Sequence, residues 1–178
     1  MEIRLAGITQ ESIADGPGLR LVIFTQGCPH NCPGCHNPDT HDINGGYVTD
    51  VEGLYQYIEK ITVRNKLLRG VTFSGGEPFL QAKPLALLAK KLRSLGLDIV
   101  AYSGFTFEQL AAMALKRKSI SALLEQTELL IDGQYKAAER DLGLAFRGSR
   151  NQRLVDVQAT IAVGRVVIWE DLAQKRWA

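Results

Sequence analysis

Apolar and polar residues follow two recurring patterns along this chain, one short and one long. The short pattern is a brief run rich in branched or aromatic residues, which is typical of a buried strand. It occurs at residues 19–25, 70–73, 97–102 and 128–132. Polar or glycine-rich residues follow each of these runs, so we predict a loop after every strand.

The long pattern places apolar residues at helical spacing and predicts amphipathic helices between the strands. Thr49 and Glu52 fit a capping box, so one helix is expected to begin at Thr49. A second helix is expected to stop at Gly96, and Thr106 with Gln109 is expected to cap a third. The two clearest apolar stripes are Val51, Leu54, Tyr55, Ile58 and Ile61, and then Leu85, Leu88, Ala89, Leu92 and Leu95.

Alternating strands and helices predict an α/β fold with a parallel sheet and helices outside it. A complete eight-unit barrel needs roughly 250 residues, and this chain has 178. We therefore expect an incomplete (β/α) barrel whose strand-end loops gather at one end, where ligands bind. Residues 153–170 are expected to form short strands, with a hairpin that turns at Gly164.

The overall composition narrows the classes of function. Hydrophobic residues make up 46% of the chain, which suits one globular domain with a real core. A net charge of +2 implies no bulk attraction to nucleic acid or membranes. The sequence shows neither an apolar run of membrane-spanning length nor a secretory signal, and its cysteine count is odd. These features together predict a cytoplasmic protein.

The stretch QGCPHNCPGCHNPDT holds every cysteine of the chain, Cys28, Cys32 and Cys35. Three thiolates spaced CxxxCxxC can hold three irons of a cubane cluster and leave the fourth iron open to a small molecule. A structural zinc site with His36 or His41 as fourth ligand is the alternative. Three unrelated buried thiols would normally be scattered along the sequence.

A second candidate site follows the predicted strand at residues 70–73, in the sequence Ser74-Gly75-Gly76-Glu77-Pro78. Two residues without side chains let backbone groups approach a ligand closely. The Glu77 carboxylate could hold a ligand ammonium. Alone this sequence is most simply a turn, but beside the cysteine loop on a parallel sheet it indicates a binding site.

At these residues the chain resembles the radical S-adenosylmethionine superfamily, which combines CxxxCxxC with a Gly-Gly-Glu motif. It is most similar to the activating proteins of glycyl-radical enzymes, and among these to the group that serves anaerobic ribonucleoside-triphosphate reductase. The stretches that carry the resemblance are 15–20, 34–38, 102–105, 131–135 and 146–153. The resemblance covers roughly residues 1–155, so residues 156–178 are expected to be a C-terminal extension of the same domain.

The resemblance implies that Cys28, Cys32 and Cys35 ligate a [4Fe-4S] cluster whose open iron is chelated by S-adenosyl-L-methionine. It also implies cofactor contacts, with Gly75, Gly76 and Glu77 at the methionine end. The residues expected to bind the cofactor are Gly34, His36, Ser74, Gly75, Gly76, Glu77 and Ser103. No side chain is expected to act as acid, base or nucleophile, because the cofactor supplies the chemistry.

The implied activity is that of an oxidoreductase: reductive cleavage of S-adenosylmethionine, then hydrogen abstraction from a glycine of the partner. The implied partner is anaerobic ribonucleoside-triphosphate reductase, with a flavodoxin or ferredoxin as electron donor. The alternatives are activation of pyruvate formate-lyase or another glycyl-radical enzyme, and direct action on a small molecule. A zinc-stabilised interaction module is the alternative outside this chemistry.

Two further expectations concern charged residues. Asp15 and Arg20 could pair across the turn before the strand at 19–25. The three arginines between Arg147 and Arg153 suit either a solvated loop or a contact with the partner or with S-adenosylmethionine.

Overall fold

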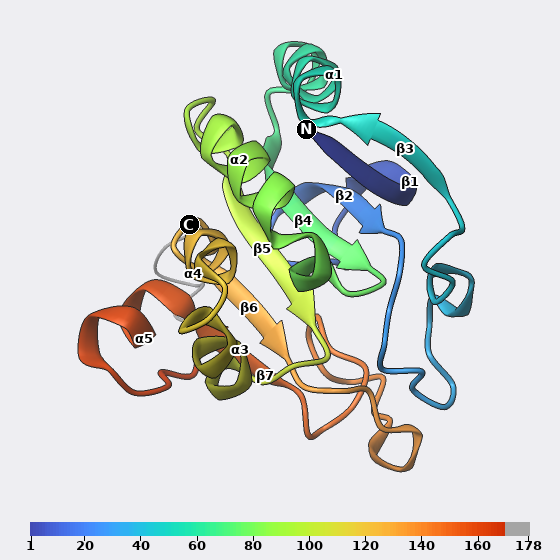
Figure 1. The fold of residues 1–178 in the computed structure, drawn as a ribbon, viewed down its shortest axis with the longest axis vertical. Helices are drawn as coiled ribbons and strands as arrows, with labels where there is room; N and C mark the ends of the chain where they lie inside the picture. The colour runs from blue at the N-terminus through green and yellow to red at the C-terminus, as the bar shows by residue number, and fades with distance from the viewer. Residues whose placement is uncertain (170–178) are drawn as a thin grey trace.

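The strands predicted from the apolar runs lie side by side and parallel, in the order β2 (Leu19–Thr25), β4 (Leu68–Gly75), β5 (Asp98–Ser103) and β6 (Leu129–Asp132). The computed structural model describes residues 1–169 (Figure 1). In β2 and β4 the register runs to Thr25 opposite Gly75, so the cysteine loop and the Ser74–Pro78 stretch start from neighbouring strand ends.

Three antiparallel strands extend this parallel centre into a sheet of seven. They are β1 (Glu2–Ser12), β3 (Tyr47–Asp50) and β7 (Arg153–Asp156). The full order is β3-β1-β2-β4-β5-β6-β7, and the two edges do not meet. The observed fold is therefore a mixed α/β sheet that is open, as an incomplete barrel would be.

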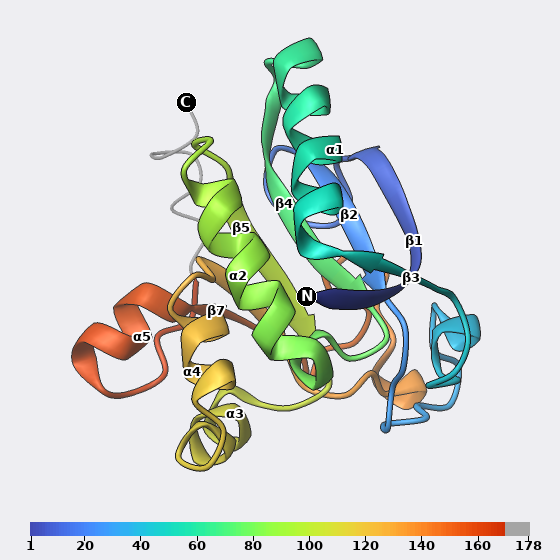
Figure 2. The same cartoon turned by 45° about the horizontal axis from the view of Figure 1, so that its top comes forward.

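Helices α1 (Val51–Arg64), α2 (Ala82–Arg93), α3 (Phe107–Ala114) and α4 (Lys118–Leu124) cover one face of the sheet (Figures 1 and 2). Both predicted apolar stripes point into the core between helices and sheet. Along β5, Ile99 and Ala101 face this core, while Val100 and Tyr102 belong to the opposite face. The face away from these helices therefore carries the side chains that can line a site.

Helix starts follow the predicted capping chemistry, with one correction. The capping box of Thr106 and Gln109 at the start of α3 is confirmed. The predicted start at Thr49 is wrong, because Thr49 lies in β3 and Asp50 is the N-cap of α1. The Asp50 carboxylate accepts hydrogen bonds from the N–H groups of Glu52 and Gly53, both at 3.0 Å.

The predicted hairpin at Gly164 is also wrong. Residues 157–163 form helix α5 (Val157–Val163). Asp156 is its N-cap, and Gly164, in the left-handed conformation, is its C-cap. Ile168 then forms an antiparallel bridge with Val155. The last part of the expected extension, residues 170–178, lies outside the described residues.

Three short 3-10 helices complete the described part of the chain: η1 (Pro38–Thr40), η2 (Pro78–Gln81) and η3 (Ala137–Glu139). Within residues 1–169, none of the helices combines the length and the apolarity that crossing a bilayer requires.

Candidate functional site

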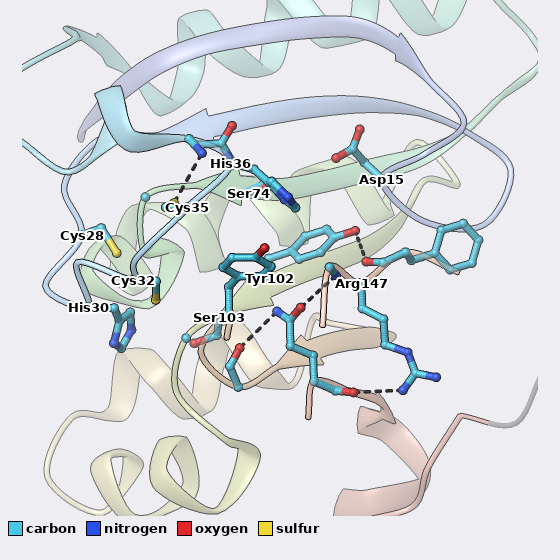
Figure 3. Close-up of a pocket in the computed structure, with 18 of the residues that line it drawn as sticks. Asp15, Cys28, His30, Cys32, Cys35, His36, Ser74, Tyr102, Ser103 and Arg147 are labelled. Atoms are coloured by element: carbon cyan, nitrogen blue, oxygen red, sulfur yellow. Dashed lines mark hydrogen bonds between the residues drawn. The ribbon is translucent and has the colours of Figure 1, made fainter. Parts of the chain in front are cut away.

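A cavity of about 500 Å³ opens at the carboxyl ends of the parallel strands, on the sheet face away from α1–α4 (Figure 3). A volume of this size is ordinary for a site that takes a cofactor. Most of the residues predicted from the sequence line it, namely Cys28, Cys32, Cys35, His36, Ser74, Gly76 and Ser103. Gly34, Gly75 and Glu77 are not among its lining residues.

The cysteine loop after β2 is held in place by its own backbone. Gly27 N–H donates to Thr40 O at 2.8 Å, and Cys28 N–H donates to His41 O at 3.2 Å, so the two ends of the loop meet. Asn31 has a φ of 46°, which lets the chain turn sharply between the first two cysteines. The loop therefore presents all three thiols to one side, where each is half-buried.

The three thiols do not converge on one point. In the described part of the chain, no group of three or more His, Cys, Asp or Glu side chains is arranged to hold a single metal ion. Zinc would need four donors at about 2.0–2.3 Å from one centre. A cubane cluster needs less convergence, because each thiolate binds a different iron. Three cysteines that surround one end of a cavity fit the cluster.

Burial raises the pKa of the Cys28 and Cys32 thiols above the usual value for cysteine. Hydrogen bonds from the backbone act in the opposite direction and offset part of this effect. Iron binds the thiolate form, so loading a cluster here must release protons. At Cys35 the sulfur already receives a hydrogen bond from Asn37 N–H at 3.4 Å.

The two glycines after β4 lie directly against the end of β2. A Cβ on Gly75 would lie 2.6 Å from Thr25 N, and one on Gly76 would overlap the Gly27 backbone. The N–H groups of Gly76 and Glu77 donate to Thr25 O and Gly27 O, each at 2.8 Å. Since these N–H groups are used, the carbonyl oxygens are what this turn can offer a ligand, and carbonyls accept from an ammonium.

The Glu77 carboxylate has protein partners on all sides and is fully buried. It accepts from Phe79 N–H at 3.0 Å, Gly104 N–H at 2.9 Å and Ser103 Oγ at 3.0 Å, and it meets His30 Nε2 at 2.8 Å. These bonds account for the carboxylate without a ligand. Its predicted contact with a ligand ammonium stays a prediction.

Gly34 and His36 lie on the far side of the cysteine loop, against the segment after β6. Gly34 has a φ of 73°, in the region that favours glycine, and its α-carbon faces the Tyr135 ring. The rings of His36 and Tyr135 are 5.0 Å apart. A Cβ on Gly148 would lie 2.9 Å from the His36 ring, so this glycine leaves room for the ring.

Several lining residues were not predicted as site residues. Tyr102 donates from its hydroxyl to Phe146 O at 2.6 Å, and Phe146 has a φ of 60°, which is uncommon for a large side chain. Placement at a strand end was the sequence signal for Tyr102. His30 lies inside the cysteine motif, but the sequence did not indicate its partners, which are distant along the chain.

The arginines between Arg147 and Arg153 differ in their surroundings, and the contact with a partner or with S-adenosylmethionine stays a prediction. Arg147 lines the cavity and donates from Nη1 to Gln152 O at 2.9 Å, while its buried Nε has no hydrogen-bond partner in the described residues. Arg153 is structural, because it pairs with Asp132 and Glu108. Arg147 therefore places a guanidinium in the cavity wall, with its unpaired Nε buried behind the surface.

Comparison with known proteins agrees with this site. A family model described as a 4Fe-4S single cluster domain matches residues 14–155. The anaerobic ribonucleoside-triphosphate reductase-activating protein of Vibrio cholerae is 32% identical over 144 residues, which cover 79% of this chain and 89% of that protein. The protein of the same name from Escherichia coli K12 is 29% identical over 144 residues, covering 79% of this chain and 90% of that protein.

A second kind of relative is the pyruvate formate-lyase-activating enzyme of Clostridium pasteurianum. It is 36% identical over 121 residues, which cover 60% of this chain and 47% of that protein. The chain therefore belongs to the 4Fe-4S single cluster domain family and, within it, to the group of the anaerobic ribonucleoside-triphosphate reductase-activating proteins.

Proposed function

We propose that this protein is a radical S-adenosylmethionine activase that generates the glycyl radical of anaerobic ribonucleoside-triphosphate reductase. Its cofactors are a [4Fe-4S] cluster and S-adenosyl-L-methionine. The observation that carries the proposal is that the cysteine loop and the Gly75–Gly76 turn leave adjacent parallel strands and share one cavity. A cluster and a ligand on its open iron would lie side by side there.

The residues assigned to the cluster are Cys28, Cys32 and Cys35. When bound, cluster and cofactor together supply the reducing electron and a carbon-centred radical. The protein contributes position and shelter. The loop holds three half-exposed thiols at one end of the cavity, which would leave the fourth iron of a bound cluster accessible to a ligand.

Four of the residues assigned to S-adenosylmethionine line the cavity: His36, Ser74, Gly76 and Ser103. The carbonyl oxygens of the Gly75–Gly76 turn would accept from its ammonium group, and Ser74 and Ser103 line the same cavity. Gly34 and His36 face its adenosyl end. We assign residues 1–155 to the partial barrel of the radical S-adenosylmethionine type, with residues 156–178 as its C-terminal extension.

The open side of the sheet is where the partner's glycine would enter. A peptide backbone offers carbonyl oxygens, and the guanidinium of Arg147, a residue that lines the cavity, is a hydrogen-bond donor of matching chemistry. The electron donor is a flavodoxin or ferredoxin, and the compartment is the reducing cytoplasm, where three free thiols persist.

Activation of pyruvate formate-lyase is the second candidate, because the Clostridium enzyme shares 36% identity with this chain. Coverage favours the reductase. The matched segment spans 89% of the Vibrio protein but only 47% of the Clostridium enzyme.

The test is incubation of the reconstituted, reduced protein with S-adenosylmethionine and either partner enzyme, followed by electron paramagnetic resonance. We expect a glycyl radical signal on the reductase, and 5′-deoxyadenosine in the products. A Cys32→Ala variant treated in the same way is the control and should give neither. A signal that arises only on the lyase would replace our assignment, and no cleavage with either partner would end it.

A further inference from the structure

We propose that His30 is a positioning residue that fastens the cysteine loop to the Gly76–Glu77 turn after β4. The inference deepens the proposed function and rests on it. His30 lies between two assigned cluster ligands, Cys28 and Cys32 (Figure 3), and only 7% of its side chain is exposed.

The hydrogen bonds of His30 fix the orientation of its ring. Nε2 lies 2.8 Å from the Glu77 carboxylate, and Nδ1 lies 3.0 Å from the Gln134 side-chain nitrogen. An ionised carboxylate can only accept, so we assign the proton to Nε2. Nδ1 then accepts from the Gln134 amide, so both ring nitrogens have a partner.

The packing around the ring is equally specific. Phe105 meets the imidazole edge-on, with ring centroids 4.5 Å apart and an interplanar angle of 70°. A Cβ on Gly104 would overlap the imidazole. The backbone of Gly104 is not in the left-handed region, so glycine is needed here for space and not for conformation.

His30 joins loops that leave four neighbouring strands. It lies in the loop after β2, and Glu77 lies in the loop after β4. The Glu77 carboxylate also receives Ser103 and Gly104 from the end of β5, and Gln134 follows β6. Within the described residues, the ring is the side chain of the cysteine loop that reaches this carboxylate.

By joining these loops, His30 would fix the spacing between the cysteine loop and the Gly76–Glu77 turn. The thiols come from the loop after β2, whereas the carbonyl groups assigned to the ligand ammonium come from the turn after β4. A ligand that bridges the cluster and this turn binds well only if the two loops keep their spacing. Residues that orient metal ligands through hydrogen bonds typically affect affinity or activity 10–100-fold.

The test compares His30→Phe with His30→Gln. Phenylalanine keeps a ring against Phe105 but forms no hydrogen bond, whereas glutamine can still donate to Glu77. We expect His30→Phe to hold iron normally and to raise the KM for S-adenosylmethionine about tenfold, with kcat within about threefold. For His30→Gln, both the KM for S-adenosylmethionine and kcat should stay within about threefold of the values of the parent protein. The exposed variant Glu52→Gln, on α1, is the matched control.

Two outcomes would overturn the proposal: a KM for His30→Phe within twofold of the parent protein, or equal impairment of both His30 variants. The KM comparison requires a variant that holds iron and a parent protein that cleaves S-adenosylmethionine. A second measurement needs neither iron nor activity. The metal-free proteins are treated with iodoacetamide, and mass spectrometry follows each cysteine. Several-fold faster labelling of Cys28 and Cys32 in His30→Phe alone supports the fastening role. Equal rates in all three proteins contradict it, whatever becomes of the activase assignment.

Discussion

Arg20 and Asp98 form an ion pair across β4, with Arg20 Nη2 2.5 Å from Asp98 Oδ1 and the guanidinium wholly buried. The guanidinium also donates to Thr72 Oγ1, Pro17 O and Val71 O. The sequence-based expectation that Arg20 pairs with Asp15 is therefore wrong. The Asp15 carboxylate accepts from Ser12 Oγ instead, also at 2.5 Å.

Replacing Arg20 with methionine should lower the free energy of unfolding by about 3 kcal/mol, because it breaks a buried pair and leaves several acceptors unsatisfied. Urea unfolding at neutral pH measures the change. Lys91→Met removes an exposed pair with Glu52, which solvent screens, and should change the free energy of unfolding far less. Equal losses in the two variants would show that burial does not decide the strength of the Arg20 pair.

Each of the single variants Cys28→Ala, Cys32→Ala and Cys35→Ala should fail to hold a stable [4Fe-4S] cluster. Two thiolates leave two irons without protein ligands. Iron and acid-labile sulfide are counted after anaerobic reconstitution, together with zinc. If the parent protein carried one zinc and no sulfide, the structural zinc site would be the correct interpretation.

Gly76→Ala should weaken binding of S-adenosylmethionine at least tenfold, because its methyl group would overlap the Gly27 backbone and push the turn out of place. Gly7→Ala is the matched control, since a Cβ there meets nothing within 4 Å. Ligand-induced change in the electron paramagnetic resonance spectrum of the reduced cluster reports the affinity. Unchanged affinity in Gly76→Ala would remove this turn from the ligand site.

Glu77→Gln separates a structural role from a ligand contact. If the carboxylate fastens the loops after β2, β4 and β5, the metal-free protein should lose about 2 kcal/mol of stability, as expected when charged hydrogen bonds are weakened. Thermal and urea unfolding without any ligand measure this. A metal-free protein of unchanged stability that binds S-adenosylmethionine poorly would instead support the ligand contact predicted from the sequence.

Arg153→Met should lower stability by about 2–3 kcal/mol at pH 7, because Asp132 is buried and loses its partner at 2.5 Å. Arg153 also holds the pKa of Glu108 down to about 2, chiefly through its hydrogen bond. A lowered folded pKa means stability that is present above the unfolded value of 4.5 and lost as the pH falls towards 2. The difference in the free energy of unfolding between variant and parent, measured with urea, should therefore narrow as the pH falls from 4.5 towards 2. A difference that stays constant over this pH range would contradict the assignment.

The four parallel strands could be predicted because each is a short run rich in branched apolar residues, which is typical of a buried strand. β2 matches its predicted bounds, and the stripes of α1 and α2 are buried as expected. β1 and β3 could not be predicted in the same way. Many of their residues are exposed or only partly buried, so neither shows a clear alternation.

The error at α5 shows how local chemistry outweighs composition. Its sequence is rich in β-branched residues, which favour strands. Asp156, however, accepts from Ala159 N–H at 2.9 Å, and Gly164 closes the last turn in the left-handed conformation. These two caps define a helix, and both residues were visible in the sequence.

Some residues of the candidate site could be found from the sequence and others could not. The cysteines and glycines were found because their spacing is itself the signal. The fastening role of His30 was not, since its partners Glu77 and Gln134 lie 47 and 104 residues away. Only the parallel order of the strands brings these residues together.

The half-exposure of the three thiols also makes the site sensitive to oxygen. An opening wide enough for a sulfonium ligand to reach an iron atom also admits dioxygen, which is smaller. Exposed thiolates and cluster sulfides are readily oxidised. We therefore expect the cluster to survive only without oxygen. Exposure to air should bleach the protein, and the colour should return only when iron, sulfide and a reductant are supplied again.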